Sequence, residues 1–332
     1  IMQTCDITSP LMSSLMAIVK GLPMIRSLCQ VLLLVLFSLL AGSDSAFAKT
    51  YQVYFLGGQS NMDGYGYAKD LPDDLKQSVP GVMIFHANSA PDAVTVDGRG
   101  LWSELKPGHG VGFKSDGKEN TYSNRFGVEL SFAKTLQQLA PEANIALIKI
   151  SRGGTSIAVE AAGNFGCWDP DFEKGTGKGQ GINQYDHFLA GMKRALQTTD
   201  IDQDGEADTL IPAGIVWMQG ESDAAYTEEI AKDYEANLKR LMDLIRATLY
   251  TDDLPVVIGR ISDSGDNPEG KVWKHGEIVR AAQAAFVEKD KRAALVTSTD
   301  EYGYSDRWHY NSEGYLDLGR NFAQALWKVP RN

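Results

Sequence analysis

A serine between glycines, Ser60, is the residue whose surroundings first suggest chemistry. It lies in the stretch Tyr51–Gly64, where an apolar and aromatic run leads into Gly57 and Gly58 and then Ser60. The apolar run predicts a buried strand, and the glycines predict a tight turn that presents Ser60 at the edge of a sheet. Because a serine hydroxyl is a weak nucleophile without a base, the rest of the chain must supply one.

His309 is the histidine best suited to be that base. Of the five histidines, it alone has a carboxylate three residues before it, Asp306, together with a predicted helix start just after it. This spacing lets Asp306 accept a hydrogen bond from Nδ1 of the histidine, so that Nε2 can face the serine. We interpret the other four histidines as surface or structural residues.

Two further clusters could stabilise a negatively charged oxygen. Gly153 and Gly154 follow an apolar run, and a glycine can present its backbone N–H with no side chain in the way. With the Ser60 N–H, such a donor could form an oxyanion hole. Gln219 directly follows another apolar run, and its side-chain amide could be a third donor. A plain turn at the glycines and a loop tied down by Gln219 are the alternative interpretations.

Strand-like and helical patterns alternate along the chain. The helical periods run through residues such as Val128–Leu139, Ile230–Leu249 and Tyr315–Leu326, and the continuous apolar runs are Val53–Leu56, Val82–Phe85, Ile145–Ile150, Ile211–Met218, Pro255–Ile261 and Ala293–Val296. Continuous runs are typical of a parallel sheet covered on both faces. We therefore predict an α/β fold, a three-layer α/β/α sandwich with a parallel central sheet, and one domain over residues 49–332. Ser60 would lie at the carboxyl end of a strand, where such sheets bind ligands.

Two irregular stretches interrupt this alternation, Asn88–Asn124 and Val159–Asn183. Both are rich in glycine and carry large aromatic residues, and loops of this length are uncommon unless they are functional. The aromatic rings either pin the loops to the body of the protein or line a groove in which a flat ring suits the face of a sugar.

The four clusters, in their order along the chain, resemble those of the SGNH (GDSL-like) hydrolases. The matching blocks are Gly58–Met62, Gly153–Thr155, Trp217–Asp223 and Asp306-x-x-His309. They are most similar to the sialate O-acetylesterase-like branch, the family 6 carbohydrate esterases, and the resemblance runs from about Tyr51 to the final helix. It implies a flavodoxin-like α/β/α sandwich and a catalytic mechanism that needs no metal.

The resemblance also implies a role for each block. Ser60 is the nucleophile, His309 the base and Asp306 the residue that orients the base. The activity implied is that of a serine esterase that removes O-acetyl groups from carbohydrates through an acyl-enzyme. Two alternatives stay open at this point: an esterase or thioesterase for lipids or other small acyl substrates, and a non-catalytic carbohydrate-binding protein on the same scaffold.

The same comparison implies an oxyanion hole made of the Ser60 and Gly154 amides and the Gln219 side chain. Gly153 is the alternative to Gly154. Gln219 takes the place that asparagine holds in the wider superfamily. Glu221 would be either a structural acid or a second partner of the histidine.

The net charge and the N-terminal sequence limit the possible partners and location of the protein. The net charge of −11 argues against nucleic acid as a partner, since phosphate binding needs a basic surface. Residues 1–48 contain an apolar run, Val31–Ala41, followed by the cleavage signal Ala46-Phe-Ala48. The run is too short to span a membrane, so we predict upstream sequence with a secretory signal peptide, no stable membrane insertion after its removal, and a secreted or periplasmic protein.

An acidic stretch separate from the four blocks resembles part of a calcium loop. Its acids are Asp200, Asp202, Asp204 and Asp208, with a glycine at the sixth position. The twelfth position would be Ile211, so the bidentate glutamate is missing. A structural calcium ion and a solvated acidic turn are both compatible with this pattern.

Overall fold

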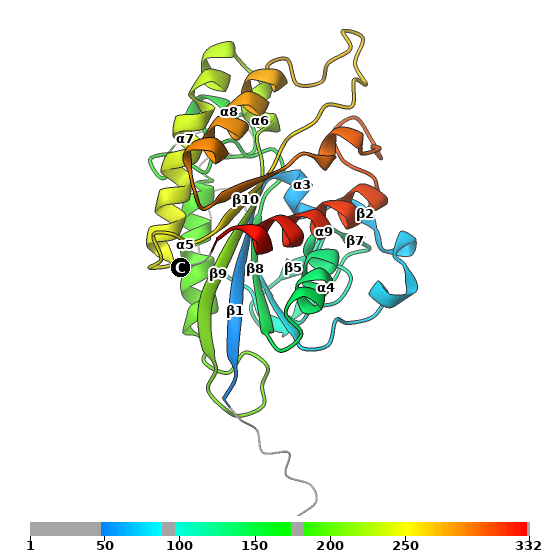
Figure 1. Cartoon of the computed structure of the whole chain (residues 1–332), viewed down its shortest axis with the longest axis vertical. Coiled ribbons are helices and arrows are strands. Elements are labelled where there is room, and N and C mark those ends of the chain that lie inside the picture. The colour runs from blue at the N-terminus through cyan, green and yellow to red at the C-terminus, as the bar shows by residue number, and fades with distance from the viewer. Residues whose placement is uncertain (1–47, 88–96, 174–181, 331–332) are drawn as a thin grey trace, which may run out of the picture. The chain divides into compact units, whose positions relative to one another are not determined.

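The central sheet has seven strands in the order β11-β10-β9-β1-β8-β3-β4, in a computed structural model that describes residues 48–87, 97–173 and 182–330 (Figure 1). Every neighbouring pair is parallel except β3 with β4. The strands are β1 (Thr50–Gly58), β3 (Val82–His86), β4 (Trp102–Glu104), β8 (Asn144–Ser151), β9 (Thr209–Met218), β10 (Val256–Gly259) and β11 (Ala293–Val296). The expected signal peptide lies outside the described residues apart from its last residue.

Helices cover the sheet, as the buried central strands require. Strands β1 and β8 are buried on both faces along almost their whole length, which needs a layer of helices on each side. Helix α4 packs on α9 and helix α7 on α8 (Figure 1). The expected α/β/α sandwich is confirmed, with α4 (Glu129–Leu139), α5 (Gln184–Gln197), α7 (Glu228–Thr248), α8 (Gly276–Lys289) and α9 (Ser312–Lys328). No helix in these described ranges is long and apolar enough to cross a membrane.

Short elements fill the connections between the main strands and helices. Two antiparallel pairs join β2 to β7 and β5 to β6. The bounds of the short elements are α3 (Ser60–Asp63), β2 (Gly66–Tyr67), η2 (Ala68–Asp70), η3 (Asp73–Leu75), β5 (Lys114–Ser115), β6 (Asn120–Thr121), β7 (Arg125–Phe126), η4 (Val159–Ala161), α6 (Glu221–Ala225) and η6 (Ser298–Glu301).

The helices form where the sequence combines an apolar face with a capping residue. Helix α7 buries Tyr234, Leu238, Leu241 and Ile245, which recur every three or four residues. Its start is set by Thr227, whose hydroxyl accepts a hydrogen bond from the backbone N–H of Ile230. Asn311 caps α9 in the same way, and this cap follows directly after the His309 segment.

Three of the four sequence blocks meet because β9, β1 and β8 are neighbours that end together. Gly58, at the end of β1, is in register with Ser151 of β8 and Met218 of β9. Gly58 has a φ of 144°, and a Cβ there would lie 1.9 Å from the Met218 carbonyl oxygen, so only glycine fits this crossing. Ser60 therefore leaves the sheet at its carboxyl edge, as expected for a ligand site.

A fully buried lysine, Lys149 of β8, ties this edge to the surrounding segments. Its Nζ donates to the carbonyl oxygens of Asp63 and His109 and to Oε2 of Glu129, each at 2.8 Å. The side chains of Lys149 and Glu129 are both 0% exposed. The ammonium thus joins the end of α3, a loop and the start of α4, and all three of its donors have an acceptor.

Replacing Lys149 by methionine should destabilise the fold strongly, because it leaves the Glu129 carboxylate buried without its counter-charge. We expect a loss of about 3–5 kcal/mol in the free energy of unfolding. The double variant Lys149→Met/Glu129→Leu should recover part of that loss, since no lone buried charge remains. Urea denaturation followed by circular dichroism measures both.

The control is Lys239→Met on the exposed face of α7, where the ion pair with Asp243 should contribute less than about 0.5 kcal/mol. A loss below about 1 kcal/mol for Lys149→Met would contradict the role given to this lysine.

Candidate active site

Ser60 begins α3, separated from the end of β1 by Gln59, and opens onto a pocket of about 430 Å³ (Figure 1 shows α3 at the end of β1). The side chain is largely buried, with 8% exposed. The residues around this pocket, which we call the Ser60 pocket, are Gln59, Ser60, Tyr65, Gly153, Gly154, Phe165, Ser222, Ala225, Tyr226, Trp273, Trp308 and His309. The structure therefore brings Ser60, His309 and the two glycines of the sequence prediction to one cavity.

His309 is held by Asp306 in the way that the sequence predicts. Its Nδ1 lies 2.8 Å from Oδ2 of Asp306, while Oδ1 of Asp306 accepts the backbone N–H groups of Trp308 and His309 at 2.8 and 2.9 Å. The ionised carboxylate only accepts hydrogen bonds, so Nδ1 carries the proton and Nε2 is free to act as a base.

The imidazole is confined further by an aromatic ring. Tyr65 stacks on His309 with 3.5 Å between ring centroids and an angle of 4° between the planes. Burial lowers the pKa of His309 below its ordinary value, and the hydrogen bond to Asp306 offsets part of this effect. A histidine with a lowered pKa is neutral, and so able to accept a proton, at pH 7. Sequence reasoning missed Tyr65, because one tyrosine in a turn carries no signal.

Asn61 links the serine turn to the histidine segment. Its Nδ2 donates to the carbonyl oxygen of Trp308 at 3.2 Å and to Oε1 of Glu221 at 2.7 Å. Its Oδ1 accepts the backbone N–H of Tyr310 at 3.4 Å. The backbone on both sides of His309 is therefore fixed to the residue that follows Ser60.

Glu221 lies beneath this link and does not line the Ser60 pocket. Its side chain is 1% exposed, Oε1 accepts the Asn61 amide, and Oε2 has no hydrogen-bond partner among the described residues. Burial raises the pKa of Glu221 to about 7. Of the two roles considered for Glu221, this placement favours the structural acid, since its carboxylate reaches Asn61 rather than the imidazole.

The two glycines after β8 have different environments. Gly153 lies beside the buried carboxyl of Asp63, whose pKa is raised by burial, an effect that the nearby Gly153 amide partly offsets. Gly154 has a φ of 76°, and a Cβ there would meet the ring of Phe165 at 2.4 Å. Both glycines line the Ser60 pocket, and the role of Gly154 as the glycine donor for an oxyanion stays a prediction.

Gln219 lies away from the pocket, against the sequence prediction. The side chain is 0% exposed, and its Nε2 donates to the carbonyl oxygen of Thr155 and to Oδ2 of Asp223 at 3.1 and 2.6 Å. Its Oε1 accepts the hydroxyl of Tyr234 at 3.0 Å. A buried amide with these partners is satisfied inside the protein and has no free donor to offer a substrate oxygen.

Exposed aromatic residues form the rim of the pocket. Phe165, Tyr226 and Trp308 are 45%, 44% and 47% exposed, although large rings are usually buried. Both interpretations of the aromatic loops hold in part: Phe165 lines the Ser60 pocket, whereas Trp102, Phe113 and Trp168 are buried and pin their loops.

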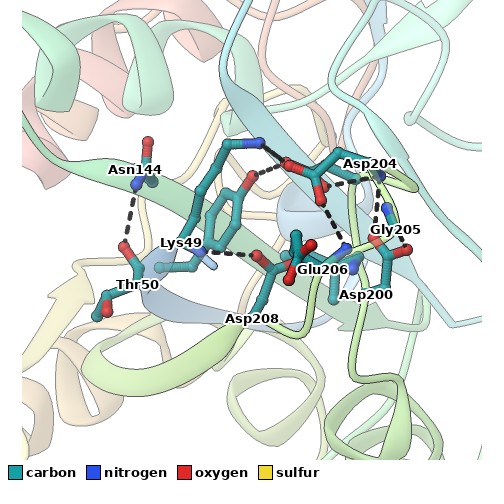
Figure 2. A network of polar contacts seen from close by, with 11 residues as sticks. Lys49, Thr50, Asn144, Asp200, Asp204, Gly205, Glu206 and Asp208 are labelled. Carbon is teal, nitrogen blue, oxygen red and sulfur yellow. Dashed lines mark hydrogen bonds and ion pairs between the residues drawn. The ribbon is translucent and has the colours of Figure 1, made fainter. Parts of the chain in front are cut away.

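The acidic stretch lies before β9, whose first residue pairs with the first residue of β1, so it is at the end of the sheet opposite Ser60. Figure 2 shows Asp200, Asp204 and Asp208 of this stretch near Lys49. Oxygens of Asp200, Asp202 and Asp208 come within 4.8 Å of one another, so these three could hold a cation. However, the Lys49 ammonium already pairs with Asp202 and, at 2.7 Å, with Asp204. Calcium binding here stays a prediction, and an ion would compete with Lys49 for Asp202. Because the acidic loop lies at the other end of the sheet from Ser60, it takes no part in catalysis.

Comparison with known proteins identifies relatives of the whole described chain. The family described as "SASA: Carbohydrate esterase, sialic acid-specific acetylesterase" matches residues 50–328. No curated protein matches the chain.

Solved structures with the same fold share little sequence. A protein from Arabidopsis thaliana has a TM-score of 0.59 at 20% identity, with 84% of this chain and 99% of that chain covered. A carbohydrate acetylesterase from Xanthomonas citri has a TM-score of 0.57 at 18% identity, covering 84% of this chain and 56% of that chain. NanS has a TM-score of 0.54 at 15% identity, covering 85% and 98%. At these identities, the likeness establishes the fold.

Replacing Glu221 by glutamine should change how stability depends on pH. The folded-state pKa is raised from 4.5 to about 7, so the native protein holds this proton more tightly than the unfolded chain. The stabilisation is complete below pH 4.5 and is lost as the pH rises through 7, an effect of about 3 kcal/mol. Glu221→Gln removes this titration and should therefore gain stability relative to wild type between pH 5 and pH 8.

Thermal unfolding at a series of pH values measures this difference, and Glu229→Gln on the exposed start of α7 is the matched control. Curves of Glu221→Gln and wild type that stay parallel across the range would contradict the prediction.

Proposed function

Since the chain belongs to the sialic acid-specific acetylesterase family of carbohydrate esterases, we propose that it hydrolyses O-acetyl esters of carbohydrates through an acyl-enzyme. One observation carries the proposal: Ser60 and His309 line the same pocket, and Asp306 holds the His309 ring with Nδ1 protonated. This combination activates a serine for attack on an ester carbonyl.

The reaction begins with proton transfer from Ser60 to Nε2 of His309. The Ser60 oxygen bonds to the acetyl carbonyl carbon, and the carbonyl electron pair moves onto the carbonyl oxygen. The Ser60 and Gly154 amides donate to this oxyanion. As the intermediate collapses, His309 gives its proton to the departing sugar hydroxyl, and Ser60 keeps the acetyl group. Water then repeats the cycle and releases acetate.

The walls of the Ser60 pocket support a carbohydrate substrate. Phe165, Tyr226 and Trp308 present exposed rings against which the apolar face of a sugar can pack. The described lining contains no Lys, Arg, Asp or Glu. An uncharged acetylated sugar unit therefore fits this pocket better than an ionic group would, because a buried charge needs a partner.

The proposed place of action is outside the cytoplasm. The apolar run Val31–Ala41 and the cleavage signal ending at Ala48 support export with removal of the leader. Polysaccharide esters are found outside the cell, so an exported esterase would reach its substrate.

Replacing Ser60 by alanine should abolish acetate release from acetylated xylan and p-nitrophenyl acetate. We expect a loss of about 10³-fold or more, because the nucleophile is removed while the pocket stays intact. The control is Ser78→Ala, a half-buried serine outside the pocket, which should keep wild-type activity. A fluorophosphonate probe should label wild type and not Ser60→Ala. Acetate release that survives in Ser60→Ala would reject the proposed function.

Activity should fall in acid with a midpoint below pH 6.5, because the pKa of His309 is lowered by burial and the base works only when neutral. Asp306→Asn should shift the midpoint further down by removing a group that raises this pKa. It should also reduce kcat about 10³–10⁴-fold. In Asp306→Asn, the backbone N–H groups of Trp308 and His309 would keep the asparagine oxygen at the Oδ1 position, so the asparagine NH₂ would face Nδ1 of His309. Nδ1 would then accept a hydrogen bond, and the single proton of the neutral imidazole would lie on Nε2.

The pH profile of kcat/KM tests both effects, with Asp243→Asn on the exposed face of α7 as control. A wild-type midpoint above pH 6.5, or a kcat of Asp306→Asn within tenfold of wild type, would count against this arrangement.

A further inference from the structure

Lys49 is the first residue after the predicted cleavage signal, and two of its nitrogen atoms contact the acidic loop, residues 200–208. Its side-chain Nζ pairs with Asp202 and, at 2.7 Å, with Asp204. Its backbone N–H donates to Oδ1 of Asp208 at 3.3 Å (Figure 2). Ala48, on the other side of the predicted cleavage point, is exposed. The residue that leader removal would leave first is thus the one that the loop holds.

The backbone of Lys49 is fixed on its carboxyl side, so its nitrogen has a defined position. The Lys49 carbonyl oxygen accepts the N–H of Thr209 at 2.8 Å, and Thr50 pairs with Thr209 where β1 and β9 begin. Nδ2 of Asn144, at the start of β8, donates to the Thr50 carbonyl oxygen at 3.2 Å. These bonds involve only atoms that remain after leader removal, so the Lys49 nitrogen would stay beside Asp208.

The acidic loop can accommodate a second positive charge. Its carboxylates are those of Asp200, Asp202, Asp204 and Asp208. The Lys49 ammonium pairs with two of them, whereas the hydrogen bonds described for the Asp208 carboxylate come from neutral backbone N–H groups, those of Lys49 and Ile201. Oxygens of Asp208 and two other acids lie within 4.8 Å of one another, where like charges repel. A cation beside Asp208 would relieve this repulsion.

We propose that hydrolysis of the Ala48–Lys49 bond completes this site, because it turns the Lys49 amide into an ammonium that forms an ion pair with Asp208. Water adds across the peptide bond, and the products are a carboxylate on Ala48 and an α-ammonium on Lys49. A neutral donor thus becomes a charged one, and charge-assisted hydrogen bonds are about twice as strong as neutral ones. Leader removal therefore stabilises the fold. The inference rests on the proposed export and is independent of the esterase reaction.

The new terminus gives this contact a pH dependence. An α-ammonium has a pKa of about 8 in an unfolded chain, and the Asp208 carboxylate favours its charged form. The stabilisation is therefore complete below about pH 8 and is lost as the pH rises through the higher folded-state value.

The other titratable groups of this cluster keep their charge in that range. Hydrogen bonds to Asp202 and Asp204 raise the pKa of the Lys49 ε-ammonium. Burial raises the pKa of the Tyr51 hydroxyl, which donates to Asp202 at 2.8 Å. Neither group titrates between about pH 8 and pH 10, so a change in stability over this range reports the α-amine.

The test compares two purified proteins, one that begins at Lys49 and one that begins at Ala46. In the second, the terminal ammonium lies three residues earlier, up to about 10 Å away, and Lys49 keeps a neutral amide. At pH 7 the protein that begins at Lys49 should have a Tm higher by about 2 °C. The difference should disappear at about pH 10, where the α-amine is neutral.

Asp208→Asn should remove the difference between the two termini, whereas Asp204→Asn, whose partner is the Lys49 side chain, should keep it. If Asp208→Asn does not fold, the pH comparison of the two unsubstituted proteins decides the question. Equal Tm values at pH 7, a difference that persists at about pH 10 or one that survives in Asp208→Asn would overturn the proposal. An exported protein whose intact mass does not match a chain beginning at Lys49 would overturn it as well.

Discussion

The amide of Asn61 is the interaction on which the geometry of this site depends. It joins the serine turn, which leaves the first strand of the sheet, to the backbone around His309, almost 250 residues later in the chain. Both ends of the amide are used, since Oδ1 also accepts the hydroxyl of Tyr315 in α9 at 2.7 Å. No strand of the sheet carries His309, and these side-chain hydrogen bonds attach its segment to the serine turn.

The fold and most of the site could be predicted from sequence because each depends on local pattern. Continuous apolar runs predict parallel strands, and polar blocks after those runs predict a site at the carboxyl edge. The Asp306–His309 pair could be predicted for the same reason, since three residues of one turn bring the carboxylate to Nδ1. Gly154 was preferred over Gly153 by resemblance, and both glycines line the Ser60 pocket.

The prediction for Gln219 was wrong in placement because position after a strand does not determine which way a side chain turns. Gln59 and Gln219 both follow strand ends, yet only the hydrogen bonds of the folded protein distinguish the one that faces the pocket. Tyr65 and Tyr226 could not be predicted either. Their contribution depends on contacts between segments far apart in the chain, for which a single aromatic letter gives no signal.

The carboxylates around this site act through neutral groups and keep their charge away from the reacting oxygen. Each orients one group of the pocket wall or of the layer behind it: Glu221 holds Asn61, Asp223 holds Gln219 and Asp306 holds His309. A carboxylate directly beside a developing oxyanion would raise its energy, whereas an amide held by a carboxylate offers a fixed donor. Burial raises the pKa of Asp63, Glu221 and Asp223, and the value of about 7 for Glu221 leaves that carboxyl partly protonated at neutral pH. The site therefore obtains rigid, oriented donors from acidic residues without placing a negative charge where negative charge must form.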